Sequence, residues 1–210
     1  MRANKATKFS RLSSRFQDRS DTAVFKKIRM STVTEQLKAE DRWAKLASRM
    51  TKVALAKKDL SYKDLAALLT GTSSDEENRR IKDPISRGTI KLSTFLKITS
   101  TIKVTVHHSW REAMPDGASW EDKASHVVKA EIAHALLSSL EVAQERLSNI
   151  GCGTTARTLP THMKNGTIAL SDFLQLLCVL NSHSADNFVE PADLTWAAQS
   201  PRRKSASNLA

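Results

Sequence analysis

The sequence is poor in the residues that build tight turns and aromatic clusters. Six glycines and five prolines occur in 210 residues, too few for a β-sandwich or barrel that depends on many turns. Aromatic residues make up 5% of the chain and tyrosine occurs once, so we expect an aliphatic core. These shortages favour an all-α fold, and the length predicts two domains of about 100 residues each.

Long apolar runs and cysteine pairs are missing as well. No stretch approaches 18 consecutive apolar residues and the segment after Met1 is charged, so we expect no membrane span and no secretory signal. Cys152 and Cys178 lie 26 positions apart without a CxxC motif. This spacing excludes a disulfide framework or zinc ligand set and predicts two buried thiols.

Motifs for catalysis and metal binding are also absent. The chain contains no GxSxG, P-loop, HExxH or GxGxxG pattern, so we expect no enzyme activity and no cofactor. His126 and His134 are eight residues apart, and the pair at 107–108 has no carboxylate or cysteine cluster beside it. Neither arrangement has the spacing of metal ligands, so we predict no metal site.

Positive charge is in excess, and its distribution is uneven. The chain has 33 Lys and Arg against 22 Asp and Glu, a net charge of +11. The net charge is +7 over residues 1–32, +6 over 33–110, −2 over 111–185 and zero over 186–210. Such an imbalance is typical of a protein that binds a polyanion such as DNA. A basic surface that serves only solubility is the alternative.

Residues 1–34 mix Arg, Lys and Ser and show no helical stripe long enough to pack. We predict a basic, flexible arm that follows phosphates. Its candidate DNA-binding residues are Arg11, Arg15, Arg19, Lys26, Lys27 and Arg29.

Helical periodicity begins near residue 35 and predicts a first domain over residues 35–105. A first helix should end near 57–59. Ser61 is placed to cap a second helix that ends at Gly71, Ser74 to cap a third, and Ser93 to cap a fourth.

The second half of the sequence repeats the first. A shift of 78 positions aligns residues 85–96 with 163–174 at seven of twelve identical positions, and Trp43 meets Trp120 with one residue inserted. We call 43–105 the first copy and 120–184 the second copy, and predict that each Trp anchors a core. Residues 106–119 are then expected to be a linker, and 185–210 a flexible tail.

Two segments of the first copy, Leu60 to Leu69 (LSYKDLAALL) and Ile85 to Leu96 (ISRGTIKLSTFL), carry a family resemblance. They resemble lambda-repressor/Cro-like helix-turn-helix domains, and more narrowly a bacterial domain family of unknown function with SYxxLAxxL and ISRG…FL segments. The resemblance implies two tandem four-to-five-helix lambda-repressor-like bundles. It also implies DNA-backbone contacts by Ser61, Tyr62 and Lys63, and a recognition segment over residues 75–87.

The sequence departs from the repressor pattern in two places. Pro84 should kink the third helix or split it, with Asp83 capping a new turn. The carboxylates of residues 75–77 would repel phosphates at the end that should face bases. With Ile81 and Ile85 inward, the better contact surface is a set of outward or flanking cations. These candidates are Arg79, Arg80, Lys82, Arg87 and Lys91.

We therefore expect a non-enzymatic, cytoplasmic and nucleoid-associated protein that binds double-stranded DNA, in transcriptional control or in plasmid or mobile-element maintenance. The second copy, which is acidic, is expected to serve packing, self-association or a protein partner. The alternative function is an adaptor or antiactivator whose bundles bind another regulator, with the arm adding nonspecific affinity for nucleic acid.

Overall fold

The computed structural model describes residues 40–135 and 139–199. They belong to one compact unit. The predicted arm and its six candidate cations lie outside the described residues, as do residues 200–210. No helix within the described ranges is long and apolar enough to cross a membrane.

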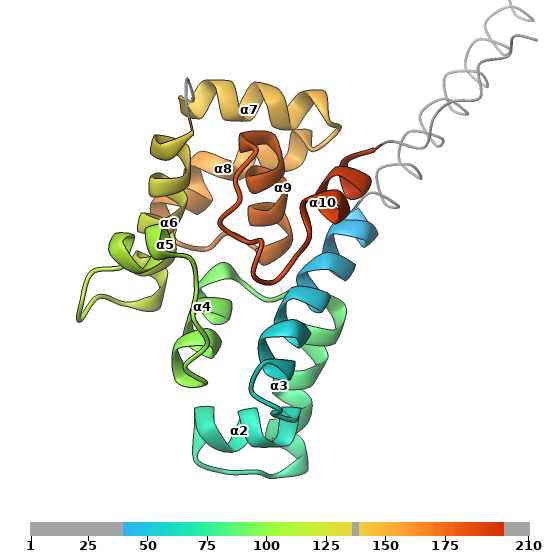
Figure 1. The fold of residues 1–210 in the computed structure, drawn as a ribbon, viewed down its shortest axis with the longest axis vertical. Helices are drawn as coiled ribbons and strands as arrows, with labels where there is room; N and C mark the ends of the chain where they lie inside the picture. The colour runs from blue at the N-terminus through green and yellow to red at the C-terminus, as the bar shows by residue number, and fades with distance from the viewer. Residues whose placement is uncertain (1–39, 136–138, 200–210) are drawn as a thin grey trace, which may run out of the picture. The chain divides into compact units, whose positions relative to one another are not determined.

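The described residues are helical apart from their connections, which confirms the all-α class (Figure 1). A first helix covers residues 40–56, and α2 (Tyr62–Thr70), α3 (Asp75–Arg87), α4 (Leu92–Thr101) and α5 (His108–Ala113) follow. The second half contains α6 (Trp120–His134), α7 (Leu140–Asn149), α8 (Gly153–Asn165), α9 (Leu170–Leu180) and α10 (Pro191–Ala198).

The ends of α2 and α3 follow from local sequence. Ser61 and Asp64 form a reciprocal capping box at the start of α2, and Gly71 ends that helix in the left-handed conformation. Ser74 caps α3 by accepting a hydrogen bond from the N–H of Glu77 at 3.2 Å. The predicted caps at Ser61, Gly71 and Ser74 are confirmed.

The prediction that Ser93 caps the fourth helix is wrong. Helix α4 begins at Leu92, its N-cap residue Lys91 makes no side-chain cap, and Ser93 is buried inside the helix. A helix normally needs a cap because its first N–H groups have no partner within the helix. Here the N–H of Leu92 donates instead to the carbonyl of Ile168, in the second copy, at 3.0 Å.

The second copy repeats the helices of the first. Helices α7, α8 and α9 begin 78 positions after α2, α3 and α4, at Leu140, Gly153 and Leu170. Ser139 caps α7 as Ser61 caps α2, accepting from the N–H of Val142. Residues 40–135 and 139–199 therefore form two tandem helical halves with the same order of elements.

Two equivalent glycines hold the third helix of each copy against the first. Gly88, after α3, has φ of +69°, and a Cβ there would lie 1.8 Å from the carbonyl oxygen of Ala44. Gly166, after α8, has φ of +62°, and a Cβ would lie 1.9 Å from the carbonyl oxygen of Glu121. Only glycine allows both the left-handed conformation and this close backbone approach.

The two copies meet at a central backbone pairing. An isolated antiparallel bridge joins Lys91 to Ala169. The N–H of Leu92 donates to Ile168, and the N–H of Leu170 donates to Ile90 at 2.9 Å. Because each of these bonds becomes the other under the 78-residue shift, the copies are related here by an approximate two-fold axis.

Each copy also inserts an aromatic side chain beside the fourth helix of the other. Trp110 from α5 contacts Phe173 of α9, and Phe188 after α9 contacts Phe95 of α4. Both pairs have ring centroids 5.4 Å apart in an edge-on arrangement. Trp110 and Phe188 are themselves 78 positions apart, so the exchange is reciprocal and the repeat extends beyond the ends predicted from the sequence.

This exchange corrects two sequence-based predictions. The predicted linker 106–119 contains α5, whose Trp110 is fully buried and donates from its indole Nε1 to Oε1 of Glu131 at 2.5 Å. Within the predicted flexible tail, residues 185–199 contain buried Phe188 and the helix α10. Asp193 of α10 forms an ion pair at 2.8 Å with Arg49 of the first helix. The amino-acid composition of these two segments predicted loops, but the burial of their aromatic side chains holds both segments in the fold.

Candidate nucleic-acid interface

Helices α2 and α3 pack against each other and are joined by residues 71–74. Leu65 of α2 and Ile85 of α3 are fully buried between them and the rest of the first copy, and Ile81 is half-buried against the same core. The inward positions predicted for Ile81 and Ile85 agree with this packing. The opposite side of α3 is therefore presented to solvent.

The three residues at the start of α2 have different environments. The Ser61 hydroxyl donates to the carboxylate of Asp64 at 2.6 Å and accepts from the Asp64 N–H at 3.2 Å. Hydrogen bonds from the Ser61 side chain and N–H lower the pKa of Asp64. Tyr62 packs against the core, and its hydroxyl is buried with no hydrogen-bond partner in the described chain. Lys63 is exposed, so it alone of the three presents an unengaged polar group to solvent.

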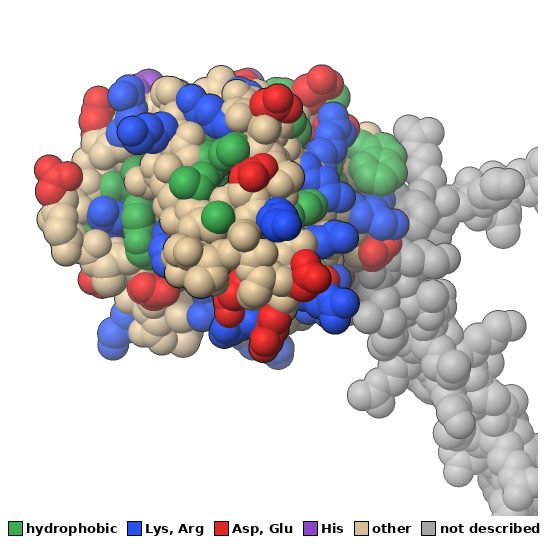
Figure 2. Space-filling model, turned by 90° about the horizontal axis from the view of Figure 1, so that it is seen from below, with side chains coloured by type: hydrophobic (Ala, Val, Ile, Leu, Met, Phe, Trp, Pro, Cys, Tyr) green, Lys and Arg blue, Asp and Glu red, His purple; other side chains and the backbone are tan. Residues whose placement is uncertain are grey.

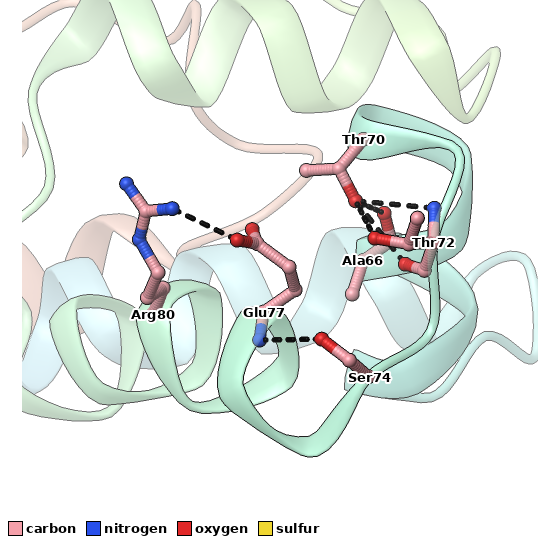
Figure 3. Close-up of polar contacts among 6 residues, drawn as sticks. All are labelled: Ala66, Thr70, Thr72, Ser74, Glu77 and Arg80. Atoms are coloured by element: carbon pink, nitrogen blue, oxygen red, sulfur yellow. Dashed lines mark hydrogen bonds and ion pairs between the residues drawn. The ribbon is translucent and has the colours of Figure 1, made fainter.

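The four predicted cations on α3, at positions 79, 80, 82 and 87, are all exposed. Arg80 forms an ion pair with Glu77 at 2.8 Å (Figure 3). An exposed pair of this kind is worth at most about 1 kcal/mol, so the guanidinium of Arg80 can be released to another anion. Arg79, Lys82 and Arg87 form no ion pair with another described residue.

The start of α3 is negatively charged. Asp75, Glu76 and Glu77 occupy its first turn, where carboxylates are stabilised by the positive end of the helix dipole. Glu77 does not complete the reciprocal box with Ser74, because its side chain turns to Arg80 (Figure 3). These carboxylates therefore have a role in the stability of the helix that is separate from any contact with a ligand.

Helix α3 runs without interruption through Pro84. The possibility that the helix splits, with Asp83 capping a new turn, is therefore wrong. Helix α8 continues through Pro160 in the same way. Because α3 is one helix, the cations at 79–82 and Arg87 belong to one continuous element.

Lys91 is exposed but lies beyond α3, at the bridge between the copies. Figure 2 shows the surface of the described unit from below, with Lys and Arg side chains interspersed with Asp and Glu. Positive charge is therefore not continuous over this face.

Helix α8, the equivalent of α3, has a different surface. It keeps exposed Arg157 at the position of Arg79 and has an exposed Lys164, but its first turn carries no acidic residue.

Cys152, just before α8, is buried, and burial raises the pKa of its thiol to about 12. Both cysteines are free thiols. Cys152 is buried as predicted, whereas Cys178 is only half-buried, and its pKa is also raised by burial.

No group of three or more His, Cys, Asp or Glu side chains within 40–135 and 139–199 is arranged to hold a metal ion.

The sequence-based predictions did not include the aromatic residues that join the copies, Trp110 and Phe188. Extending the 78-residue shift would have paired Trp110 with Phe188.

The fold thus defines a class of protein: an all-α chain with two fused copies of one four-helix arrangement. The family described as "Domain of unknown function (DUF6471)" matches residues 43–106 and again 120–185, so the chain belongs to that family. Comparison with curated proteins and with solved structures gave no significant match.

Proposed function

We propose that this protein binds duplex DNA through the exposed face of α3, with α2 and α3 of the first copy acting as a helix-turn-helix unit of the lambda-repressor type. Two packed helices joined by a short turn, the second with an exposed outer face, support this assignment. The family itself has no known function, so the proposal depends on the surface chemistry of α3.

The observation that carries the proposal is the charge of α3 after its first turn. From Asn78 to the end of the helix, four exposed cations stand against one carboxylate, Asp83. Each Lys or Arg that contacts a phosphate releases condensed counterions and so contributes to affinity. The net charge of +6 over residues 33–110 places this group in the basic half of the chain.

The acidic first turn determines which contacts this face makes. Asp75 and Glu76 are exposed and would repel phosphates, so the later turns of α3 approach the nucleic acid more readily than the first turn. Phosphate contacts position a protein on DNA without reading bases. The proposed protein therefore binds DNA with a marked salt dependence and a modest sequence preference.

The test compares matched variants of the two copies in the full-length protein. The double variant Arg79→Ala with Arg87→Ala should bind a fluorescent duplex at least tenfold more weakly than the parent, a loss of about 1.4 kcal/mol. The control Arg157→Ala with Lys164→Ala removes two exposed cations from α8 and should retain parental affinity. Anisotropy titrations at several salt concentrations measure both, and the melting temperatures of both variants should stay near that of the parent.

The alternative is an adaptor or antiactivator that binds another regulator, and the carboxylates on the first turn of α3 favour it. The affinity of a protein that makes six to ten phosphate contacts with DNA falls by a factor of about 10³ to 10⁵ between roughly 50 and 200 mM salt. Equal DNA binding by the two double variants, or no sequence preference in a selection from random duplexes, would favour the adaptor.

A further inference from the structure

A pocket of about 460 Å³ lies between the copies, next to α2 and α3. Its walls come from α2, α3 and α4 of the first copy and from the start of α6 in the second. The volume falls within the range of small-molecule sites, about 300 to 1,000 Å³. Apolar surface is supplied by Leu69, Ile81, Ile98 and Trp120.

Two polar groups of α4 also line the pocket. Ser93 is 2% exposed, and no hydrogen bond joins its hydroxyl to another described residue. Because no described residue accepts from this hydroxyl, it can donate to a ligand in the pocket. Lys97 follows four residues later and therefore lies on the same side of α4. It forms no ion pair within the described ranges.

The equivalent positions in the second copy are joined to one another by hydrogen bonds. Thr155, the equivalent of Glu77, donates to Gln175 at 2.7 Å, and Gln175, the equivalent of Lys97, is 4% exposed. In the first copy Glu77 pairs with Arg80 instead (Figure 3), and Lys97 is exposed. Trp43 is buried in its copy, whereas its equivalent Trp120 is only half-buried at the pocket.

We propose that this pocket binds a small molecule that carries one carboxylate on an apolar body. Lys97 and the Ser93 hydroxyl donate hydrogen bonds to the carboxylate, and such charge-assisted bonds are stronger than neutral ones. The apolar body contacts Ile81, Ile98 and Trp120. Glu121 also lines the pocket and is exposed, so it repels a second negative charge and selects monocarboxylates. This binding does not depend on the proposed contact with DNA.

Calorimetric titration of the full-length protein with 4-phenylbutyrate tests the proposal, with 4-phenylbutyramide as the neutral analogue. We expect saturable binding with one site per chain, and binding of the amide at least tenfold weaker. Lys97→Met should weaken carboxylate binding at least tenfold, whereas Lys129→Met, which removes an exposed cation of α6, should leave it unchanged. Glu121→Gln should tighten carboxylate binding a few-fold.

Three results would overturn the proposal: no saturable binding of 4-phenylbutyrate at about 1 mM, equal affinity for the acid and the amide, or equal effects of Lys97→Met and Lys129→Met. Ser93→Ala provides a second reading, because it removes one donor with little change in volume. It should weaken the carboxylate more than the amide.

Discussion

The two copies have the same arrangement of helices but different surfaces. Buried positions agree closely between them: Phe95 and Phe173, like Leu92 and Leu170, are almost completely buried at equivalent sites. The outer faces of α3 and α8 do not agree, since α3 exposes four cations and has three carboxylates in its first turn, which α8 mostly lacks. Core packing constrains a repeat strongly, whereas a solvated helix face can change at little cost to the fold.

The copies also differ at the positions that line the pocket in the first copy. Thr155, Gln175 and Asp172 are linked by hydrogen bonds in the second copy, where the first copy has the pocket. Yet neither copy is an independent body, because Trp110 and Phe188 are exchanged between them. Tests of the difference between the copies therefore need the whole chain rather than separate halves.

The largest expected effect comes from breaking the aromatic exchange. Trp110→Ala and Phe188→Ala should each destabilise the protein by about 3 to 5 kcal/mol, because each empties a buried site in the opposite copy. Denaturant unfolding should remain a single transition, since both copies share this packing. The control is Trp196→Ala, at a side chain that is 56% exposed. Two separate transitions in either variant would show that the copies unfold independently.

The next effect tests whether the equivalent glycines are equally important. Gly88→Ala and Gly166→Ala should each cost about 3 kcal/mol or more, because the new methyl group meets backbone at under 2 Å and φ is positive. Gly71→Ala is the control: its φ is +76° but nothing lies within 4 Å of the new Cβ, so only the strain of about 1 kcal/mol remains. Chemical denaturation measures all three, and a tolerated Gly166→Ala would mean that the second copy packs less tightly.

The smallest effect concerns Asp172, where the first copy has Thr94. Burial raises the pKa of Asp172 above its ordinary value of 3.8, against the opposing influence of His162. The folded state therefore binds this proton more tightly than the unfolded state, and stability falls as pH rises from about 4 through the folded pKa. Asp172→Asn should raise the melting temperature more at pH 7 than at pH 4.

Asp116→Asn, at an exposed loop position, is the control for this pH series. A gain in melting temperature at Asp172→Asn that is the same at both pH values would show that ionisation of Asp172 does not limit stability.

Several features were predictable because they depend on neighbours in the chain. The caps at Ser61 and Ser74, the end of α2 at Gly71 and the inward direction of Ile85 all follow from contacts within about four residues. The repeat was visible as well, since identical residues recur at a constant shift. The exposure of the α3 cations follows from the same periodicity, although their role in binding remains a proposal.

What the sequence by itself determined was therefore local: helices, their ends, the two copies and the uneven charge. The tertiary structure alone decided that α5 and residues 185–199 are packed, that Leu92 needs no side-chain cap, and that a pocket lies beside Ser93. Each of these depends on residues tens of positions away, such as Ile168 for Leu92 and Phe173 for Trp110. Hydrophobic burial and backbone hydrogen bonding across such distances leave no helical periodicity in the sequence, because they arise only when the two copies fold against each other.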